Sequence, residues 1–253
     1  MDAMEQRRNA IVDFINEEGS ITFSQLEKKF TEVSQMTLRT DLKALDEAKR
    51  IVRVHGGAKS VEVVLGTDDF IGLRSVRNVE AKEEIARKTL ELIRPNQTVY
   101  LDSGSTATAL ARIWPDQQNF IFTNSLECIM ELAKLKNPKV FIPGGELNRY
   151  SLSMCGEQAT NFVKKVNFDL AIIGVTCYST DTGFSCGVLD EAYLKHTVMK
   201  QAEKSVILMD SSKVDKKKTF QICSLHEADI VVADRQIPPS FVKECKDAGV
   251  TLL

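Results

Sequence analysis

Thr98-Val-Tyr-Leu-Asp-Ser-Gly-Ser-Thr106 decides the fold of this chain, because it joins an apolar strand to the start of a helix. The strand predicted over 98–101 runs into a polar turn that contains a glycine, and a helical pattern opens at Thr106. Backbone N–H groups at such a turn have no partner within the helix, and the helix dipole adds partial positive charge. The turn is therefore suited to an anion, above all a phosphate. The alternative is an ordinary strand-to-helix turn whose hydroxyls cap the helix.

The region from Val79 onward alternates between apolar strands and helical patterns. Strands are predicted at 98–101, 120–123, 139–142, 170–173, 205–209 and 230–233. Helices are predicted at 81–93, 106–113, 158–165, 189–203 and 239–248, and another helix follows the strand over 120–123 and ends at 136. This alternation predicts an α/β domain with a mostly parallel sheet that is covered on both faces. Ligands of such sheets bind beyond the carboxyl ends of the strands.

Small, hydroxylated or charged residues follow five of the predicted strands. They are Asp102 to Thr106, Thr123 to Ser125, Gly144 and Gly145 with Asn148 and Arg149 close behind, Gly174, and Asp210 to Lys213. Each can be a capping or turn residue by itself. Five strands that deliver such residues to one edge together favour a site for a small, polar, anionic ligand. Glu191 and Lys195 lie four residues apart on a predicted helix, so they could reach this edge or form an exposed ion pair.

The first sixty residues predict three short helices, over 5–17, 25–30 and 35–49, followed by a β-hairpin over 51–58. Ser34 is a good N-cap for the third helix, which directs Leu38, Leu42 and Leu45 inward. The residues on its opposite face are Gln35, Thr37, Arg39, Thr40 and Lys43. This layout is typical of a winged helix-turn-helix, whose third helix enters the major groove of DNA. The alternative is a helical bundle for protein contacts.

Local charge favours DNA as the partner of this small domain. The whole chain has a net charge of -2, but 33–59 contains six basic and three acidic residues, or +3. Basic side chains such as Arg53 on the wing suit phosphate contacts.

Bulk composition is ordinary for a soluble protein. The 253 residues suffice for one large and one small domain, with 43% hydrophobic and 27% charged residues. None of the apolar runs reaches transmembrane length, and the first eight residues do not resemble a signal peptide, so we expect a cytoplasmic protein. The six cysteines are scattered without a Cys-x-x-Cys pair, which predicts buried or half-buried, reduced thiols and neither a zinc site nor a disulfide framework.

Two stretches carry a resemblance to the DeoR family of bacterial transcription regulators. Val33-Ser-Gln-Met-Thr-Leu-Arg-Thr-Asp-Leu-Lys-Ala-Leu45, followed by Arg53-Val-His-Gly-Gly-Ala58, resembles the DNA-binding signature of that family. The resemblance implies DNA contacts at Ser34, Gln35, Thr37, Arg39, Thr40, Lys43, Arg53 and His55. The chain departs from the family pattern at Thr40, where a second basic residue is usual. It also lacks the usual glycine between the third helix and the wing.

The second half resembles the sensor domain of the same family, whose fold is similar to that of ribose-5-phosphate isomerase. The matching stretches are Leu101-Asp-Ser-Gly-Ser-Thr106, Thr123-Asn-Ser125, Gly144-Gly145, Asp169 with Gly174, and Asp210-Ser-Ser-Lys213. The resemblance implies a phosphorylated sugar at Asp102, Gly104, Ser105, Thr106, Thr123, Asn124 and Lys213. Further candidates for ligand contacts are Arg74, Ser103, Ser125, Gly145, Arg149, Glu191 and Lys195.

These patterns predict a DNA-binding domain over 1–59, a linker over 60–78 and an effector domain over 79–253. Phe70 and Arg74 resemble family positions that lead into the effector domain, although Arg74 could equally be a solvated surface residue. We expect a homo-oligomeric repressor that binds operator DNA and a phosphorylated sugar, with no cofactor and no enzymatic activity. The alternatives are a sugar-phosphate isomerase-like enzyme and a regulator whose second domain serves only oligomerisation.

Overall fold

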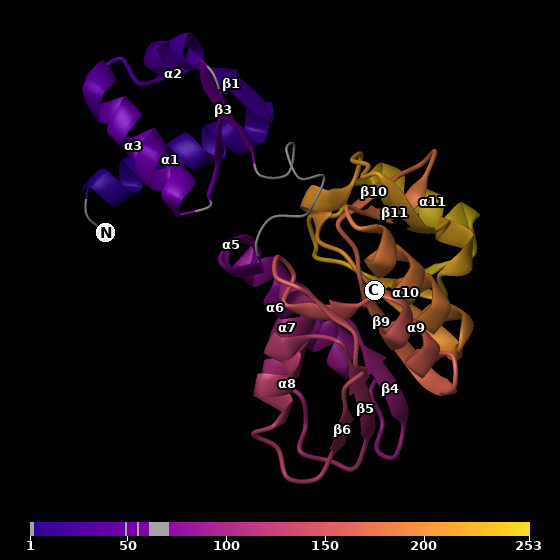
Figure 1. Ribbon diagram of the computed structural model, residues 1–253. Helices are drawn as coiled ribbons and strands as arrows, with labels where there is room; N and C mark the ends of the chain where they lie inside the picture. Colours follow the sequence, from indigo (N-terminus) through magenta and orange to yellow (C-terminus); the bar gives the residue numbers. More distant parts are fainter. Residues whose placement is uncertain (1–2, 49, 55, 61–70) are drawn as a thin grey trace. The chain divides into compact units, whose positions relative to one another are not determined.

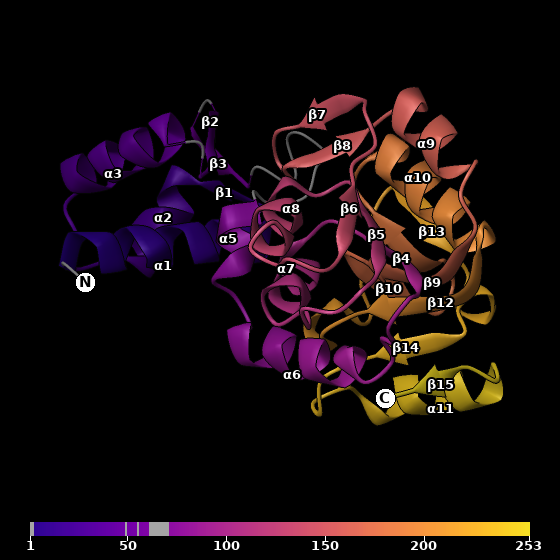
Figure 2. The ribbon, with the colours of Figure 1, turned by 90° about the horizontal axis from the view of Figure 1, so that it is seen from below.

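Two units make up the chain, residues 1–69 and 70–253, in a computed structural model that describes residues 3–48, 50–54, 56–60 and 71–253. Figures 1 and 2 show the elements of both units. His55 and the segment 61–70, with Phe70, were singled out from the sequence and lie outside the described residues. The domain boundaries after residues 59 and 78 remain a prediction.

The described residues of the first unit form three helices and three strands. They are α1 (Ala3–Glu18), β1 (Ser20–Thr22), α2 (Phe23–Lys29), α3 (Gln35–Glu47), β2 (Val52–Val54) and β3 (Gly57–Lys59). The antiparallel pair β2 and β3 confirms the predicted wing hairpin. The strand β1 was not predicted, and it pairs with β3 so closely that a Cβ on Gly57 would lie 2.1 Å from the carbonyl oxygen of Ile21. Three residues are too few to show strand periodicity in the sequence.

The core of the first unit is made by one side of each helix. Ile11 and Ile15 from α1, Leu26 from α2, and Leu38 and Leu45 from α3 are almost completely buried. The N-terminus of α3 is capped as predicted, because the Ser34 hydroxyl accepts the N–H of Thr37 at 3.2 Å. The inward face of α3 is therefore the one that its leucine spacing predicted.

The second unit is built on a seven-stranded parallel sheet in the order β15-β14-β12-β9-β4-β5-β6, which can be followed in Figure 2. Its strands are β4 (Thr98–Leu101), β5 (Phe120–Thr123), β6 (Lys139–Phe141), β9 (Phe168–Gly174), β12 (Ala202–Leu208), β14 (Ile230–Val232) and β15 (Thr251–Leu252). The chain runs outward from β4 to β6, returns to β9 beside β4, and runs outward again to β15. The strand order thus reverses between β4 and β9, and their carboxyl ends form a topological switch point.

Helices cover both faces of this sheet, which confirms the predicted architecture (Figure 2). One face is covered by α6 (Val79–Leu90), α7 (Ser105–Arg112) and α8 (Leu126–Leu132), and the other by α9 (Glu157–Val163), α10 (Leu189–Lys200) and α11 (Pro239–Asp247). Leu170 and Ile172 point to the first face, whereas Ala171 and Ile173 point to the second. Burial on both faces explains why β9 is apolar at nearly every position.

Several short elements of the second unit were missed. They are α5 (Ile71–Ser75), the hairpin of β7 (Glu146–Asn148) and β8 (Ser153–Cys155), an antiparallel sheet of β10 (Cys177–Ser179), β11 (Gly183–Cys186) and β13 (Phe220–Cys223), the edge strand β15, and two 3-10 turns, η1 (Ser211–Lys213) and η2 (Leu225–Glu227). The predicted extension of the 189–203 helix is wrong at its end, because β12 begins at Ala202 and pairs with β9. The pairing of β12 with β9 outweighs the helical pattern of 201–203.

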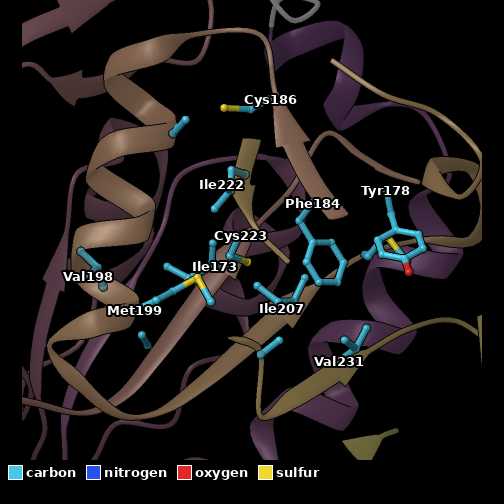
Figure 3. Packing of buried hydrophobic residues seen from close by; sticks show 14 of the residues in the cluster. Ile173, Tyr178, Phe184, Cys186, Val198, Met199, Ile207, Ile222, Cys223 and Val231 are labelled. Carbon is cyan, nitrogen blue, oxygen red and sulfur yellow. The ribbon is translucent and has the colours of Figure 1, made fainter. Parts of the chain in front are cut away.

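The small antiparallel sheet completes the core on the α10 side of the large sheet. Figure 3 shows Phe184 of the small sheet beside Ile207 of the large sheet, and Met199 of α10 beside Ile173. Ile222 and Val198 belong to the same buried cluster. All six cysteines are buried, as predicted. Burial raises the pKa of Cys128 and of Cys223 to about 12, so both stay as neutral thiols.

Candidate functional site

The exposed side of α3 carries the residues that were predicted to contact DNA. Gln35, Arg39, Thr40 and Lys43 are exposed and Thr37 is half-buried, while Ser34 is used as the cap. The Arg39 guanidinium lies 4.5 Å from the centre of the Phe23 ring, a cation–π contact that orients it. The predicted wing residue Arg53 is also exposed.

A buried ion pair fixes α3 against α1. Asp41 is only 1% exposed, and it accepts hydrogen bonds from Arg7 at 2.7 Å and from Arg8 at 2.9 Å. Burial works to raise the pKa of Asp41, but the two arginines outweigh it and hold the pKa below its ordinary value. Sequence reasoning missed this role of Asp41, although its place on the leucine side of α3 was a usable signal.

The carboxylate of Asp102 lies at the switch point of the large sheet. Asp102 follows β4 directly and is fully buried, and its Oδ2 accepts the N–H of Gly174 at the end of β9, at 3.0 Å. The same oxygen contacts the Nζ of Lys195, which also donates to the carbonyl oxygen of Gly174 at 3.0 Å. The edge predicted from strand ends therefore does bring Asp102, Gly174 and Lys195 together.

Lys195 and Glu191 are buried, so the expected alternative of an exposed ion pair is wrong. Lys195 is 5% and Glu191 is 4% exposed, on the face of α10 that is turned toward the sheet. Burial works to lower the pKa of Lys195, but the charges of Asp102 and Glu191 outweigh it and raise the pKa, so the ammonium stays charged. Glu191 accepts hydrogen bonds from Asn148, Ser151 and Ser153.

The turn after β5 lies beside the β7–β8 hairpin. Thr123, Asn124 and Ser125 are all buried, and Ser125 caps α8 by accepting the N–H of Cys128 at 3.2 Å. The Asn124 amide donates to the carbonyl oxygen of Met154 at 3.0 Å. Ser125 is thus a helix-capping residue and Thr123 a turn residue, which is the alternative that the sequence allowed for them. The amide oxygen of Asn124 is left for other partners.

Two buried acceptor atoms near the switch point have no donor among the residues that the structure describes. They are Oδ1 of Asp102 and Oδ1 of Asn124. A buried acceptor without a partner costs about 1–3 kcal/mol, so such atoms mark places where a ligand or water donates. Their positions follow neighbouring parallel strands, β4 and β5.

The turn that opens α7 has the form that its glycine predicted. Gly104 is the N-cap of α7 with φ of 115°, a backbone conformation that favours glycine. Ser103 is buried, whereas Ser105 and Thr106 in the first turn of the helix are half-buried. The free N–H groups of this turn and its hydroxyls are suited to an anion, as expected.

Lys213 lies in a different group of positive charges, after β12. Its 3-10 turn, η1, is capped by Asp210, which accepts the N–H of Ser212 at 3.1 Å. Charges of Lys213 and Arg74 act on the buried Lys82, and the pKa of Lys82 falls to about 8, mainly because of burial. Lys82 donates to the carbonyl oxygen of Arg74 in the last turn of α5 and to that of Arg77 just after it. Sequence reasoning missed Lys82, because a lysine on an amphipathic helix is usually solvated.

The remaining candidates lie around the β7–β8 hairpin. Gly145 has φ of 139°, and a Cβ there would lie 2.4 Å from the carbonyl oxygen of Cys155, so packing explains this glycine. Arg149 is exposed in the turn of the hairpin. Asn148, Ser151 and Ser153 were not recognised as a set, because their common partner Glu191 is about forty residues away in the chain.

Neither a membrane-spanning helix nor a metal cluster is found in the described part of the chain. No helix there combines the length and the apolar character that crossing a bilayer requires. Within the same residues, no group of three His, Cys, Asp or Glu side chains is arranged to hold a metal ion.

Comparison with known proteins finds matches along nearly the whole chain. Residues 7–64 match the family model of the DeoR-like helix-turn-helix domain, and residues 77–235 match that of the DeoR C terminal sensor domain. The HTH-type transcriptional regulator GlpR of Haloferax volcanii is 30% identical over 249 residues, which are 98% of this chain and 96% of that protein. The HTH-type transcriptional regulator GolR of Listeria innocua is 31% identical and covers 97% of this chain and 96% of its own length.

Two further similarities are more distant. The glycerol-3-phosphate regulon repressor of Escherichia coli K12 is 27% identical over 248 residues, which are 98% of this chain and 97% of that protein. Among solved structures, ribose 5-phosphate isomerase A of Methanocaldococcus jannaschii matches 54% of this chain and 55% of its own chain, with a TM-score of 0.40 and 19% identity.

Proposed function

Because the chain belongs to the DeoR family of transcriptional regulators, we propose that it represses a carbohydrate operon and is controlled by a phosphorylated sugar bound at the carboxyl edge of the large sheet. The first unit would contact operator DNA through the exposed side of α3 and the wing. The relatives GlpR and GolR are transcriptional regulators by name, and the relative from E. coli is a repressor of a glycerol-3-phosphate regulon. The last of these names, which contains a phosphate ester, supports a ligand of that class.

The observation that carries the ligand proposal is the pair of buried acceptors without donors, Oδ1 of Asp102 and Oδ1 of Asn124. Hydroxyl groups of a sugar are donors of the right kind, and each would replace a lost hydrogen bond to water. The N–H groups of the Gly104 turn are proposed to hold the phosphate. Lys195 and the N–H of Gly174 hold Oδ2 of Asp102 in place, so that the other oxygen, Oδ1, accepts from the ligand.

Lys213 is proposed to supply a positive charge to the bound phosphate, as the family resemblance implies. The charges of Arg74 and Lys213 both lower the pKa of Lys82, so both act on the same region. Arg74 would therefore add to the positive potential that draws an anion to this edge of the sheet.

Binding of DNA is proposed to involve a homo-oligomer. Paired helix-turn-helix units read two half-sites, and linking them raises the overall affinity without new contacts.

Thermal unfolding of the full chain against a panel of sugar phosphates and their unphosphorylated parent sugars tests this proposal. A ligand at 100 times its dissociation constant stabilises the folded state by about 2.7 kcal/mol, which corresponds to several degrees for a unit of this size. We expect one phosphosugar to raise the unfolding temperature while its parent sugar does not. A broad panel without any shift would contradict the proposed site.

The second candidate function is a sugar-phosphate isomerase-like enzyme. The observation in its favour is a carboxylate and a lysine, Asp102 and Lys195, in one buried site. Isomerisation needs a base that moves a proton between neighbouring carbons. Oδ2 of Asp102 is held in the ion pair, so Oδ1 is the oxygen that would have to serve as that base. Steady turnover of pentose or hexose phosphates by the purified protein would overturn the regulator proposal in favour of the enzyme.

A further inference from the structure

We propose that Glu191 is a positioning residue that connects the Asp102–Lys195 pair to the start of α5 through the β7–β8 hairpin. This inference rests on the proposed function, because it concerns how occupancy of that site is transmitted to the segment that follows residues 61–70. Asn148 and Ser151 are the hairpin residues through which the connection runs.

Glu191 holds the hairpin by one carboxylate oxygen. Its Oε1 accepts from Ser151 Oγ at 2.6 Å, from Asn148 Nδ2 at 2.9 Å and from Ser153 Oγ at 3.3 Å. The hydroxyls of Ser151 and Ser153 are also 2.7 Å apart. Hydrogen bonds to a charged acceptor are about twice as strong as neutral ones. The shape of the hairpin turn therefore depends on where this carboxylate lies.

The hairpin in turn supplies the partner for the first backbone N–H of α5. Asn148 Oδ1 accepts the N–H of Tyr150 at 2.9 Å, and the carbonyl oxygen of Tyr150 accepts the N–H of Ile71 at 2.8 Å. An N–H group in the first turn of a helix has no acceptor within the helix. Ile71 is only 3% exposed, so its N–H needs the acceptor that the hairpin provides.

The other end of the connection reaches the candidate ligand site. Lys195 lies one turn after Glu191 on α10, so the two side chains share a face. Its ammonium group contacts Asp102 and is acted on by the charge of Glu191 as well. The hairpin also contacts Asn124 directly, because Met154 exchanges two hydrogen bonds with it, at 2.8 and 3.0 Å.

These contacts define how a ligand changes the start of α5. A ligand that donates to Oδ1 of Asp102 weakens the hold of this carboxylate on Lys195, which is bound at Oδ2, and the ammonium is drawn toward Glu191. Glu191 is then shared between the lysine and the hairpin hydroxyls, and the hairpin no longer holds the N–H of Ile71 in the same way. Such a change couples the two places only as far as the ligand prefers one arrangement to the other.

Hydrogen exchange of the full-length protein without any ligand tests the connection. Ser151→Ala removes one donor to Glu191, and we expect the amides of 71–75 to exchange about tenfold faster, as for loss of one hydrogen bond to a charged group. Glu191→Gln should act in the same direction. Ser185→Ala is the matched control, because Ser185 is also buried and its hydroxyl accepts the N–H of Lys218 in another part of the fold.

A double-mutant cycle with Asp102→Asn tests whether the ligand site and the hairpin act along one route. We expect Asp102→Asn to speed exchange in 71–75, and the double variant with Ser151→Ala to exchange no faster than Ser151→Ala alone. Exchange in β9 and β12 reports whether each variant is folded. If Asp102→Asn does not fold, Ser151→Ala and Glu191→Gln decide the question.

Equal exchange of 71–75 in Ser151→Ala and Ser185→Ala would overturn the inference, as would independent effects of Asp102→Asn and Ser151→Ala that multiply in the double variant. These measurements use no phosphosugar. A panel of phosphosugars without a hit would therefore remove the proposed function and leave the result on the hairpin readable by itself.

Discussion

Lys195 is the residue whose loss we expect to destabilise the second unit most. Its side chain is buried with the carboxylate of Asp102, and Lys195→Met would leave that carboxylate buried without its cation. Breaking a buried ion pair on one side costs about 3–5 kcal/mol. We expect the free energy of unfolding to fall by that amount in urea, followed by the fluorescence of Trp114, the single tryptophan, which is buried in this unit.

The control for this variant is Lys200→Met on the same helix. Lys200 pairs with Glu227 at 3.0 Å, but its side chain is 60% exposed. An exposed pair contributes about 0–1 kcal/mol. If both variants lose the same stability, the Asp102–Lys195 pair is not the anchor of the sheet edge that we infer.

Arg39 is the residue that we expect to separate DNA binding from ligand binding. It is exposed on α3 and oriented by Phe23, so Arg39→Ala removes a positive side chain without opening the core. The loss of a base or phosphate contact costs about 1–3 kcal/mol of DNA affinity. Titration of a fluorescent duplex should show that loss, while the thermal shift caused by a phosphosugar stays as in the wild type. Loss of both responses would mean that the variant is unfolded.

At the scale of elements, the Arg7–Asp41–Arg8 contact is what we expect to hold α3 in place. Asp41→Asn should lower the free energy of opening of α3 by about 1–3 kcal/mol at neutral pH, measured by hydrogen exchange of its amides. The pKa of Asp41 is lowered below its ordinary value of 3.8 in the folded state. The stability that Asp41 contributes is therefore present above pH 3.8 and is lost as the pH falls through its folded pKa.

The difference in opening free energy between Asp41→Asn and the wild type should accordingly shrink as the pH falls below 3.8. A difference that stays constant down to the acid range, or that grows, would show that the carboxylate charge is not what Arg7 and Arg8 contribute.

Elements with a strong local pattern could be predicted from the sequence, and elements without one could not. The leucine spacing of α3 and the apolar runs of β4 and β9 gave the winged helix and the parallel sheet. The β7–β8 hairpin was missed, because three-residue strands have no readable period. The end of α10 was wrong, since the pairing of Ala202 with Phe168 is a contact between distant residues.

The residues of the candidate site also fall into those that could be predicted from the sequence and those that could not. Asp102, Asn124 and the Gly104 turn follow strand ends, so their position at one edge could be predicted from the parallel direction of the strands. The partner of Asp102 could not be predicted. The sequence suggested Lys213 as a positive charge for the bound phosphate and indicated no cation for Asp102, whereas the structure brings Lys195 to Asp102 across ninety-three positions of the chain. Burial of Glu191 and Lys195 depends on how α10 packs, and this packing could not be predicted from the local sequence.

At the scale of the whole molecule, repression controlled by a phosphosugar requires that the second unit alters what the first unit does on DNA. Both units are needed for this, and so is a difference in ligand affinity between the DNA-bound and the free protein. Thermal shifts report ligand binding, and variants of the first unit report DNA binding. The effect of one on the other is measured by titrating the full chain on DNA.

The most direct measurement is therefore the affinity of the full chain for a duplex selected from a random pool, with and without the phosphosugar that raises its unfolding temperature. We expect that phosphosugar to weaken DNA binding by about 5- to 150-fold, the usual range of coupling between sites, and its parent sugar to leave the affinity unchanged. An unchanged DNA affinity at a concentration of phosphosugar that saturates the second unit would contradict the proposed regulation.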